Sequence, residues 1–238
     1  MNKKNLDQEP VLQAKHQNKQ ADEVIVIAVD GPTAAGKGTI ARKLAQHLGF
    51  ACLDTGLLYR AVAVKALENK INWEVGQAIS LSIIARKLTP LDLSHPALRD
   101  EIIGRGASII AAIPEVRSAL LDFQRRFHLL GKPVKGVVLD GRDIGTVVYP
   151  DAHLKLFITA SQQVRAERRY KELLNRGLPV IYAQVLLDVQ ERDNRDQKRS
   201  SAPLIPATDA IIIDSSSLNA DQVLAIALHH VQKKLGLP

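Results

Sequence analysis

The chain has 238 residues, 46% hydrophobic but only 4% aromatic, so its core must come from Val, Ile, Leu and Ala, as in a parallel α/β sheet buried on both faces. The net charge of +7 leaves open a nucleic acid, an anionic lipid surface or a pocket for several phosphates. The single cysteine, Cys52, excludes an internal disulfide, and the seven histidines lack the spacing of a zinc site.

Residues 1–23 mix both signs of charge with Gln and Asn, show no hydrophobic periodicity and lack the apolar centre of a signal peptide. No run in the sequence reaches the ~18 apolar residues of a membrane helix. We therefore expect a disordered N-terminal tail on a soluble, cytoplasmic protein without a membrane partner.

The β-branched run Val24–Asp30 predicts a buried strand, and apolar residues at helical spacing after it predict a helix that stops at Gly49. The loop between them, GPTAAGKGT, is close to the phosphate-binding pattern G-x-x-x-x-G-K-[ST], but Gly38 takes the hydroxyl position and Thr39 follows one place late. Backbone N–H groups of such a loop surround an anion, and Lys37 would add positive charge at the outer phosphates. A strand-to-helix turn without a ligand is the alternative, and the late threonine argues against a GTPase.

A succession of helical patterns fills residues 55–130. They lie at Leu57–Glu68, Val75–Leu88, Ala97–Ala112 and from Pro114 onward. The stretch Leu88–Leu98 predicts a loop or a stunted hairpin. A helical excursion here should lie over the C-terminal edge of the sheet, where ligands bind in α/β folds.

The sequence LDTGLLYR begins the first of these helices, with Thr55 and Gly56 at its start and Arg60 about one turn later. On its own, Arg60 is as compatible with a surface arginine as with a functional one. Near a phosphate loop it becomes a candidate clamp, because a guanidinium group binds phosphate in a bidentate way.

Three further strands are predicted, at Gly136–Asp140, His153–Thr159 and Ala210–Asp214. Helical patterns follow the last two and separate them, at Ser161–Asn175, Val180–Arg199 and Ala220–Leu235. Strands that alternate with helices indicate a parallel, doubly wound sheet.

Charged residues gather where the strand Gly136–Asp140 ends. Asp140 is its last residue, and Arg142 and Asp143 follow at once in the loop. Charges at such strand ends usually serve a ligand, although a turn rich in Asp and Gly also has a purely structural interpretation. Asp140 resembles the carboxylate that lies beside a phosphate loop and Mg²⁺.

Two predicted helices carry arginine on one face. The first has Arg165, Arg168 and Arg169, and the second has Arg192, Asp196 and Arg199, with Arg195 nearby. Like charges at this spacing repel, so an anionic ligand would help to explain them, whereas solvated surface helices are the alternative. The helices flank Asn175–Val180, and the arrangement predicts a mobile lid that brings arginines onto a triphosphate.

The motifs in combination are DGPTAAGKGT, LDTGLLYR, DGRDIGTVVYPDA, ERDNRDQKR, APLIPATDA and DSSSL. Together they resemble the bacterial cytidylate kinase family, from about Val24 to the C-terminus. The resemblance implies an α/β fold, a P-loop NTPase-type parallel sheet flanked by helices, in a single kinase domain. Its core would comprise 24–54, 131–174 and 200–238, with a monophosphate-binding flap at about 55–130 and an arginine-rich helical lid at about 175–199. It also implies transfer of the γ-phosphoryl group of ATP to CMP or dCMP with Mg²⁺.

The resemblance assigns roles to individual residues. ATP would be held by Gly31, Pro32, Thr33, Ala34, Ala35, Gly36, Lys37, Gly38, Thr39 and Arg168. CMP would be held by Thr55, Arg60, Ser108, Arg117, Asp140, Arg142, Asp143, Arg192, Asp196 and Arg199. The catalytic charges would be Lys37, Arg60, Arg142, Arg192 and Arg199. Thr39 and Asp140 would bind Mg²⁺ indirectly, through water, while Ser108, Arg117 and Asp143 would read cytosine.

Two departures from the family's pattern are visible. Ala34 replaces a glycine often found in the middle of the loop, and Ile71–Leu98 is too short and too helical for the small antiparallel sheet that the family's flap usually carries. We therefore expect no sheet there. A related P-loop kinase with another monophosphate acceptor remains open.

An ATP-binding regulator or a nucleic-acid binder is the alternative from another class. The arginines argue against it, because they cluster in the lid and clamp segments. Base-stacking aromatics are also scarce. We expect a monomer whose partners are small molecules, with no nucleic acid.

Overall fold

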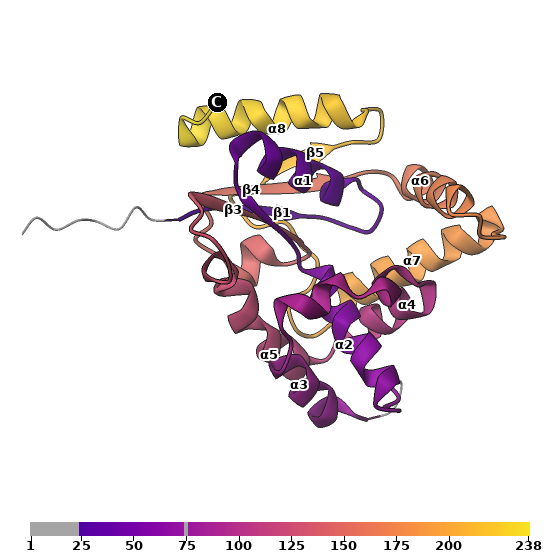
Figure 1. Cartoon of the computed structure of the whole chain (residues 1–238). Helices are drawn as coiled ribbons and strands as arrows, with labels where there is room; N and C mark the ends of the chain where they lie inside the picture. Colours follow the sequence, from indigo (N-terminus) through magenta and orange to yellow (C-terminus); the bar gives the residue numbers. More distant parts are fainter. Residues whose placement is uncertain (1–23, 74–75) are drawn as a thin grey trace, which may run out of the picture.

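The computed structural model describes residues 24–73 and 76–238. Its centre is a parallel sheet with the strand order β2-β3-β1-β4-β5 (Figure 1). The strands are β1 (Ile25–Asp30), β2 (Ala51–Asp54), β3 (Gly136–Gly141), β4 (Leu154–Thr159) and β5 (Ile211–Asp214). The predicted parallel α/β sheet is confirmed, whereas the expected disorder of residues 1–23 concerns residues outside the described ranges.

Helices cover the sheet and extend beyond it. They are α1 (Lys37–Leu48), α2 (Gly56–Glu68), α3 (Ala78–Arg86), α4 (Glu101–Ile110), α5 (Pro114–Arg125), α6 (Gln162–Asn175), α7 (Tyr182–Lys198) and α8 (Ala220–Leu235). Each predicted helix is present, with bounds that differ by a few residues. The predicted start at Val75 lies outside the described residues.

The strand β2 is missing from the sequence-based prediction, which has no strand between Val24–Asp30 and Gly136–Asp140. Only four residues long, β2 is too short to show a pattern of its own. It pairs with β3, so that Leu53 lies opposite Leu139 and Asp54 lies opposite Asp140. This pairing brings a second carboxylate to the edge where the strands end.

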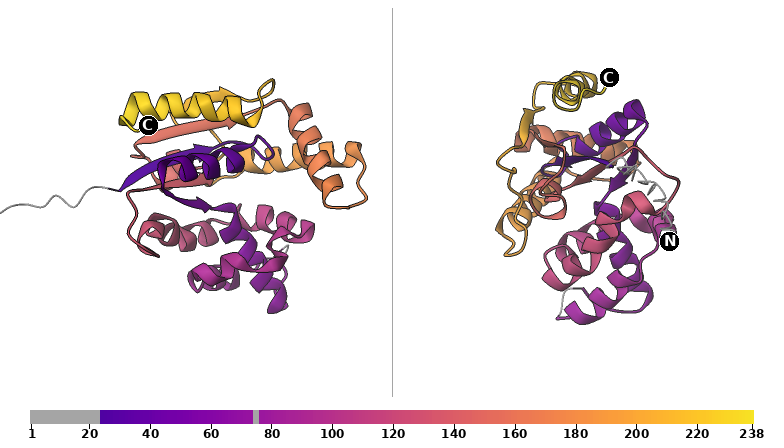
Figure 2. Two further views of the ribbon diagram at one scale, coloured as in Figure 1. Left: turned by 45° about the horizontal axis from the view of Figure 1, so that its top comes forward. Right: turned by 90° about the vertical axis from the view of Figure 1, so that its left-hand side faces the viewer.

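Alternate residues of β1 enter two different cores. Ile27 and Val29 pack in the core that also contains buried residues of α1 and α8. Val26 and Ala28 belong to the core shared with the helical segment 55–130. Figures 1 and 2 show these helices as layers on opposite sides of the sheet. Because side chains of a strand alternate between its faces, a central strand between two helical layers is apolar throughout.

The segment 55–130 contains α2 to α5, and none of its described residues belongs to a strand. The expectation that Ile71–Leu98 lacks an antiparallel sheet thus agrees with the structure for the described part. The stretch Leu88–Leu98 forms two short 3₁₀ helices, Pro90–Ser94 and Pro96–Arg99, rather than a hairpin. Each begins with proline, whose fixed φ suits the first position of a helix.

The helices α6 and α7 form the predicted pair, joined by a short turn. The Ser161 side chain accepts a hydrogen bond from Val164 N at the start of α6. Gly177 ends this helix with a φ of 73°, a left-handed conformation that glycine adopts without strain. In Figure 1 the pair projects from one end of the sheet, and α7 runs back toward α4.

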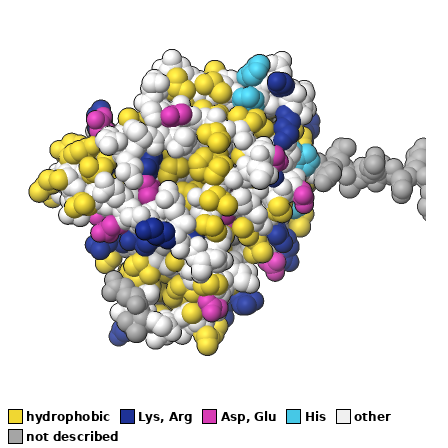
Figure 3. All heavy atoms as spheres, turned by 180° about the vertical axis from the view of Figure 1, so that it is seen from behind, with side chains coloured by type: hydrophobic (Ala, Val, Ile, Leu, Met, Phe, Trp, Pro, Cys, Tyr) yellow, Lys and Arg dark blue, Asp and Glu magenta, His cyan; other side chains and the backbone are white. Residues whose placement is uncertain are grey.

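No helix in the described ranges is both long and apolar enough to cross a bilayer. Figure 3 shows one face of the molecule, on which apolar side chains gather near the middle. Lys and Arg side chains of the described residues are scattered over this face and interspersed with Asp and Glu. The net positive charge therefore does not form one broad basic surface on this side.

Candidate active site

The loop of residues 31–39 joins β1 to α1 in the context that the motif requires. Gly31 has a φ of 147°, and a Cβ atom there would lie 2.0 Å from the carbonyl oxygen of Ile158, so only glycine fits. Lys37 is the first residue of α1, which places the positive end of the helix dipole at the loop. Ala34 has a left-handed φ of 56°. The residue that replaces the glycine therefore adopts a conformation that costs a non-glycine residue ~1–2 kcal/mol.

Side chains from outside hold the carbonyl groups of this loop. Arg165 donates to the carbonyl oxygen of Thr33 at 3.3 Å, and Arg168 donates to that of Ala35 at 3.4 Å. The Ser215 hydroxyl also donates to Ala35 O, at 3.0 Å. The C=O and N–H of a trans peptide point in opposite directions, so these contacts direct the paired N–H groups away from them. The loop is thus preorganised to receive an anion.

Lys37 and Asp140 meet below the loop. The Lys37 Nζ lies 3.8 Å from Asp140 Oδ1 and donates to the carbonyl oxygen of Pro32 at 3.4 Å. Asp140 Oδ1 is buried and has no hydrogen-bond partner among the described residues. Burial raises the pKa of Asp140, and burial also lowers that of Lys37, with Arg142 adding to the effect. A buried acceptor without a protein partner is a position at which a ligand or an ordered water would satisfy the carboxylate.

Asp143 lies between two arginines from different segments. Arg117, on α5, donates to Asp143 Oδ2, and Arg199 Nη2 lies 3.8 Å from Asp143 Oδ1. The Arg117 guanidinium is also 5.8 Å from the ring centroid of buried Tyr59 and donates to Ala111 O at 3.1 Å. Asp143 is thereby fixed at the bottom of a polar pocket, with both oxygens directed toward arginines.

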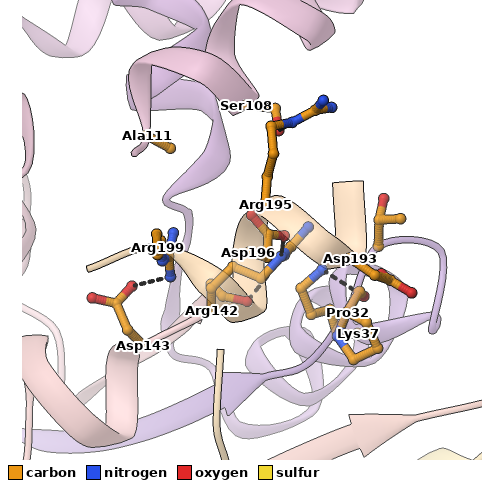
Figure 4. A network of polar contacts seen from close by, with 12 residues as sticks. Pro32, Lys37, Ser108, Ala111, Arg142, Asp143, Asp193, Arg195, Asp196 and Arg199 are labelled. Atoms are coloured by element: carbon orange, nitrogen blue, oxygen red, sulfur yellow. Dashed lines mark hydrogen bonds and ion pairs between the residues drawn. The ribbon is translucent and has the colours of Figure 1, made fainter. Parts of the chain in front are cut away.

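A second ion pair joins β3 to α7. Arg142 Nε donates to Asp196 Oδ2 at 2.9 Å, as Figure 4 shows. Arg192 Nε and Arg199 Nη2 are buried, and neither has a hydrogen-bond partner within the described part of the chain. Burial and the neighbouring Arg142 lower the pKa of Arg192 to about 10. Cationic donors without partners beside like charge form a site that an anion would stabilise.

Most of the residues predicted to bind the monophosphate line one cavity of about 60 Å³. All predicted CMP-binding residues except Asp140 line it, namely Thr55, Arg60, Ser108, Arg117, Arg142, Asp143, Arg192, Asp196 and Arg199. A larger cavity of about 460 Å³ adjoins it between α4 and α7 and shares Arg60, Ser108 and Arg192. Residues distant in sequence are therefore brought together as the motifs predict.

Thr55 and Arg60, like several of the residues above, already have partners inside the protein. The Thr55 hydroxyl donates to Asp140 O at 2.8 Å, which ties α2 to the end of β3. Arg60 Nη1 donates to Leu98 O at 2.7 Å. Both still line the cavity, so their roles toward CMP stay predictions.

The arginines of α6 do not converge on one site. Arg165 forms a buried, bidentate ion pair with Asp193 of α7, at 2.9 and 2.6 Å. Arg168 donates to the Ser215 hydroxyl at 2.9 Å and to its carbonyl oxygen at 2.6 Å. Arg169 binds Glu101 of α4. Protein groups thus explain this cluster, and the predicted contact of Arg168 with ATP stays a prediction.

A model of the family described as cytidylate kinase matches residues 27–233. The chain belongs to the cytidylate kinase family. It is 53% identical over 209 residues to a protein named cytidylate kinase from Paramagnetospirillum magneticum, covering 88% of this chain and 98% of the relative. It is 48% identical over 213 residues to the one from Azorhizobium caulinodans, covering 89% and 100%. A solved structure of an uncharacterized protein from Eubacterium ventriosum has a TM-score of 0.50 at 15% identity, covering 87% of this chain and 98% of its own, which shows the fold alone.

In this cytidylate kinase family member, the residues around Asp140 fit a magnesium ion held mainly by substrate. No group of three or more His, Cys, Asp or Glu side chains in the described ranges is placed to hold a metal. Magnesium usually keeps several waters and takes one or two carboxylates plus phosphate oxygens. Asp140, with its unpartnered Oδ1 beside the loop, meets that need. Thr39 is exposed on the first turn of α1, and its predicted role stays a prediction.

The sequence offered no reason to place Asp30, Asp193 or Tyr59 at this site, and it indicated Arg195 only as a neighbour of the second arginine cluster. Asp30 binds the turn after Asp143, and Arg195 Nε donates to the Ser108 hydroxyl at 3.2 Å (Figure 4). Asp193 and Tyr59 complete two of the pairs described above. For Asp30, the one sequence feature that could have indicated a role is its position at the end of a predicted strand, immediately before the phosphate loop.

Proposed function

We propose that this protein transfers the γ-phosphoryl group of ATP to CMP or dCMP, giving ADP and CDP or dCDP. The observation that carries the proposal is a pair of buried guanidinium nitrogens, Arg192 Nε and Arg199 Nη2, in two residues that line the same cavity as Asp143. Neither nitrogen has a hydrogen-bond partner among the described residues, and Arg199 Nη2 has only the Asp143 carboxylate nearby, at 3.8 Å. A phosphate would occupy the donors, and the carboxylate would take the base. Membership in the cytidylate kinase family makes the chain a phosphotransferase that uses ATP as its donor.

The chemistry needs charge and position rather than a base. An oxygen of the CMP phosphate attacks the γ-phosphorus of ATP while the bond to the β-phosphate oxygen breaks. The attacking oxygen is already anionic, so no proton has to be removed. Lys37 would neutralise the transferred group, and Arg60, Arg142, Arg192 and Arg199 would hold and neutralise the phosphates. Mg²⁺, when bound near Asp140, would supply further neutralisation of the ATP phosphates.

Base selection would fall to Asp143, Arg117 and Ser108. Cytosine presents an amino donor where uracil presents a carbonyl oxygen. A fixed carboxylate accepts from the amino group and repels the carbonyl. Arg117 holds Asp143 from one side, which supports a carboxylate with a defined direction.

The sugar hydroxyls would meet Arg192 and Asp196 on α7. Asp196 is buried and bound by Arg142, so its second oxygen can accept from a hydroxyl. Thr55 and Arg60 would complete the phosphate end of the site.

We propose that residues 55–130 act as a flap and 175–199 as a lid around the core segments 24–54, 131–174 and 200–238. The 60 Å³ cavity is smaller than the ~300–1,000 Å³ of most ligand pockets, because its own ion pairs fill it. CMP would have to replace contacts such as Arg142–Asp196. Glu101, on α4 of the proposed flap, forms ion pairs with Arg169 of α6 and with Arg176. Arg176 belongs to the proposed lid, so an ion pair already joins flap and lid.

A monomer in the cytoplasm without nucleic-acid or membrane partners belongs to the same proposal, since both substrates are small and water-soluble. The charge supports small-molecule partners, because the arginines of the site are buried or half-buried around a cavity. Sedimentation of the full chain tests the monomeric state, and a mass of about twice 26.1 kDa would contradict it.

The deciding assay follows ADP release. The full chain is incubated with ATP and Mg²⁺ and, in parallel, CMP, dCMP, UMP, AMP or shikimate. Fast turnover with CMP or dCMP supports the proposal. Preference for another acceptor would indicate a related kinase, and no turnover with any acceptor would indicate an ATP-binding regulator.

A further inference from the structure

Asp30 is a buried carboxylate at the end of β1 that lines neither cavity of the candidate site. Its Oδ1 accepts a hydrogen bond from Ile144 N at 2.9 Å, and its Oδ2 accepts one from Gly145 N at 2.8 Å. These two residues follow Asp143 directly. A single side chain from another strand therefore binds two consecutive backbone donors of the turn that presents Asp143.

The turn leaves these two donors in need of a partner. Ile144–Val148 forms a single π-helical turn, in which Val147 N and Val148 N donate to the carbonyl oxygen of Asp143. The N–H groups of Ile144 and Gly145 precede these bonds, and both residues are buried. A buried N–H without an acceptor is costly. Asp30 thus acts on this turn as a capping residue acts on the start of a helix.

The fit around Gly145 is close. A Cβ atom at this position would lie 3.0 Å from Lys155 Cδ and 3.5 Å from Asp30 Oδ2. Lys155 itself is buried and bound to Asp209 at 2.8 Å. The turn therefore packs closely against Asp30 and Lys155, and its position relative to β1 depends on its contact with Asp30.

A buried carboxylate at position 30 carries an energetic cost, because its charged form is removed from water. Burial raises the pKa of Asp30 to about 7, and the negative charges of Asp143 and Asp140 add to the effect, while the two backbone donors oppose it. An asparagine would fill the same space without the desolvated charge, but it has only one acceptor oxygen for two N–H donors.

We propose that Asp30 is a positioning residue for base recognition: by holding the N–H groups of Ile144 and Gly145, it fixes the direction in which Asp143 meets the cytosine amino group. The inference rests on the proposed function. Asp30 does not touch the base and acts only through the turn. Its loss should therefore weaken discrimination between bases more than it weakens ATP binding.

The test compares kcat/KM for CMP with kcat/KM for UMP in the full chain and in Asp30→Asn, with the KM for ATP measured in both. We expect the CMP-to-UMP ratio to fall about 10-fold or more, because a displaced Asp143 would no longer meet the cytosine amino group in the favourable direction. The KM for ATP should change less than about twofold. An unchanged ratio, or equal losses toward CMP and ATP, would overturn the proposal.

Asp193→Asn is the matched control, since it also neutralises a buried aspartate but one that binds Arg165 of α6. It should alter ATP use or stability and leave the base ratio unchanged. If Asp30→Asn does not fold, Gly145→Ala disturbs the same contact from the other side, and an unchanged ratio there would also overturn the proposal. A wild-type protein that does not use CMP would refute the proposed function itself. If both the wild type and Asp30→Asn prefer CMP over UMP to the same degree, only the role of Asp30 would be refuted.

Discussion

The ammonium group of Lys37 and the carboxylate of Asp140 face each other at 3.8 Å where the phosphate loop passes the end of β3. Both groups are buried, and burial shifts their pKa values toward each other. The pH range in which both side chains are ionised is therefore narrower than it would be for an exposed Lys and an exposed Asp. Phosphate binding at the loop needs the ammonium charge, so this range should be visible in the reaction.

The first prediction concerns the loss of activity at high pH. Because burial lowers the pKa of Lys37 in the free protein, kcat/KM for ATP should decline at a pH clearly below the ordinary lysine pKa of ~10.4. Lys37→Arg keeps its charge and should move that decline to higher pH, even if kcat/KM is lower overall. The measurement is kcat/KM for ATP against pH from 6 to 10 at saturating CMP. A decline at the same pH in both proteins would assign it to another group.

The second prediction concerns Asp143. Asp143→Asn retains the shape but replaces one acceptor by a donor, so the CMP-to-UMP ratio of kcat/KM should fall by about 10- to 100-fold. The KM for ATP should hardly change, because the phosphate loop lies elsewhere. Steady-state kinetics with both acceptors checks this. Equal losses toward ATP and CMP would show that Asp143 maintains the site as a whole rather than reads the base.

The sequence predicts the loop side of this site well, for local reasons. A strand, a glycine loop and Lys37 are consecutive, and each has a fixed geometric relation to the next. Asp140 and Arg142 were predicted because parallel strands end at one common edge, so charges at a strand end reach the ligand region. The Gly49 and Asn175 helix ends follow from local backbone preferences as well.

Contacts between distant segments could not be predicted in this way. Helical spacing places Arg165 and Arg168 on one face, but it does not say that the first meets Asp193 and the second meets Ser215. Asp30 and Ile144 are 114 residues apart, and only the packing of β1 beside β3 brings them together. The strand β2 was missed because four residues carry too little pattern.

The third prediction links Asp30 to stability. Its pKa in the folded protein, about 7, is above the ordinary ~3.9, so between these values the folded state binds a proton that the unfolded state does not. Its contribution to the free energy of unfolding should therefore fall as pH rises from about 4 to about 7. In urea unfolding, the free energy of wild type minus that of Asp30→Asn should decrease over this range and level off above it. Asp140 is present in both proteins, so only its coupling to Asp30 enters this difference. A difference independent of pH would contradict the shift.

The last prediction concerns the ion pair that joins α6 to α7. Arg165 and Asp193 are each about 95% buried, and Arg165 also donates to the carbonyl oxygen of Ala160 at 2.9 Å. Arg165→Met leaves the Asp193 carboxylate buried without its partner, which typically costs ~3–5 kcal/mol. The double variant Arg165→Met/Asp193→Leu removes both charges and should recover much of that loss, since apolar groups of similar size often replace a buried pair without penalty.

Arg169→Met is the control on the same helix, because the Glu101 side chain that it binds is 45% exposed and such pairs contribute only ~0.2–1 kcal/mol. Urea unfolding of all variants at one pH provides the comparison. If Arg165→Met costs no more than Arg169→Met, the buried pair does not hold α6 and α7 together. If the double variant is as unstable as the single one, the lost contacts with Ala160 and Thr33, rather than the stranded carboxylate, account for the effect. The second result would move the structural role of Arg165 from α7 to its contacts with Ala160 and Thr33.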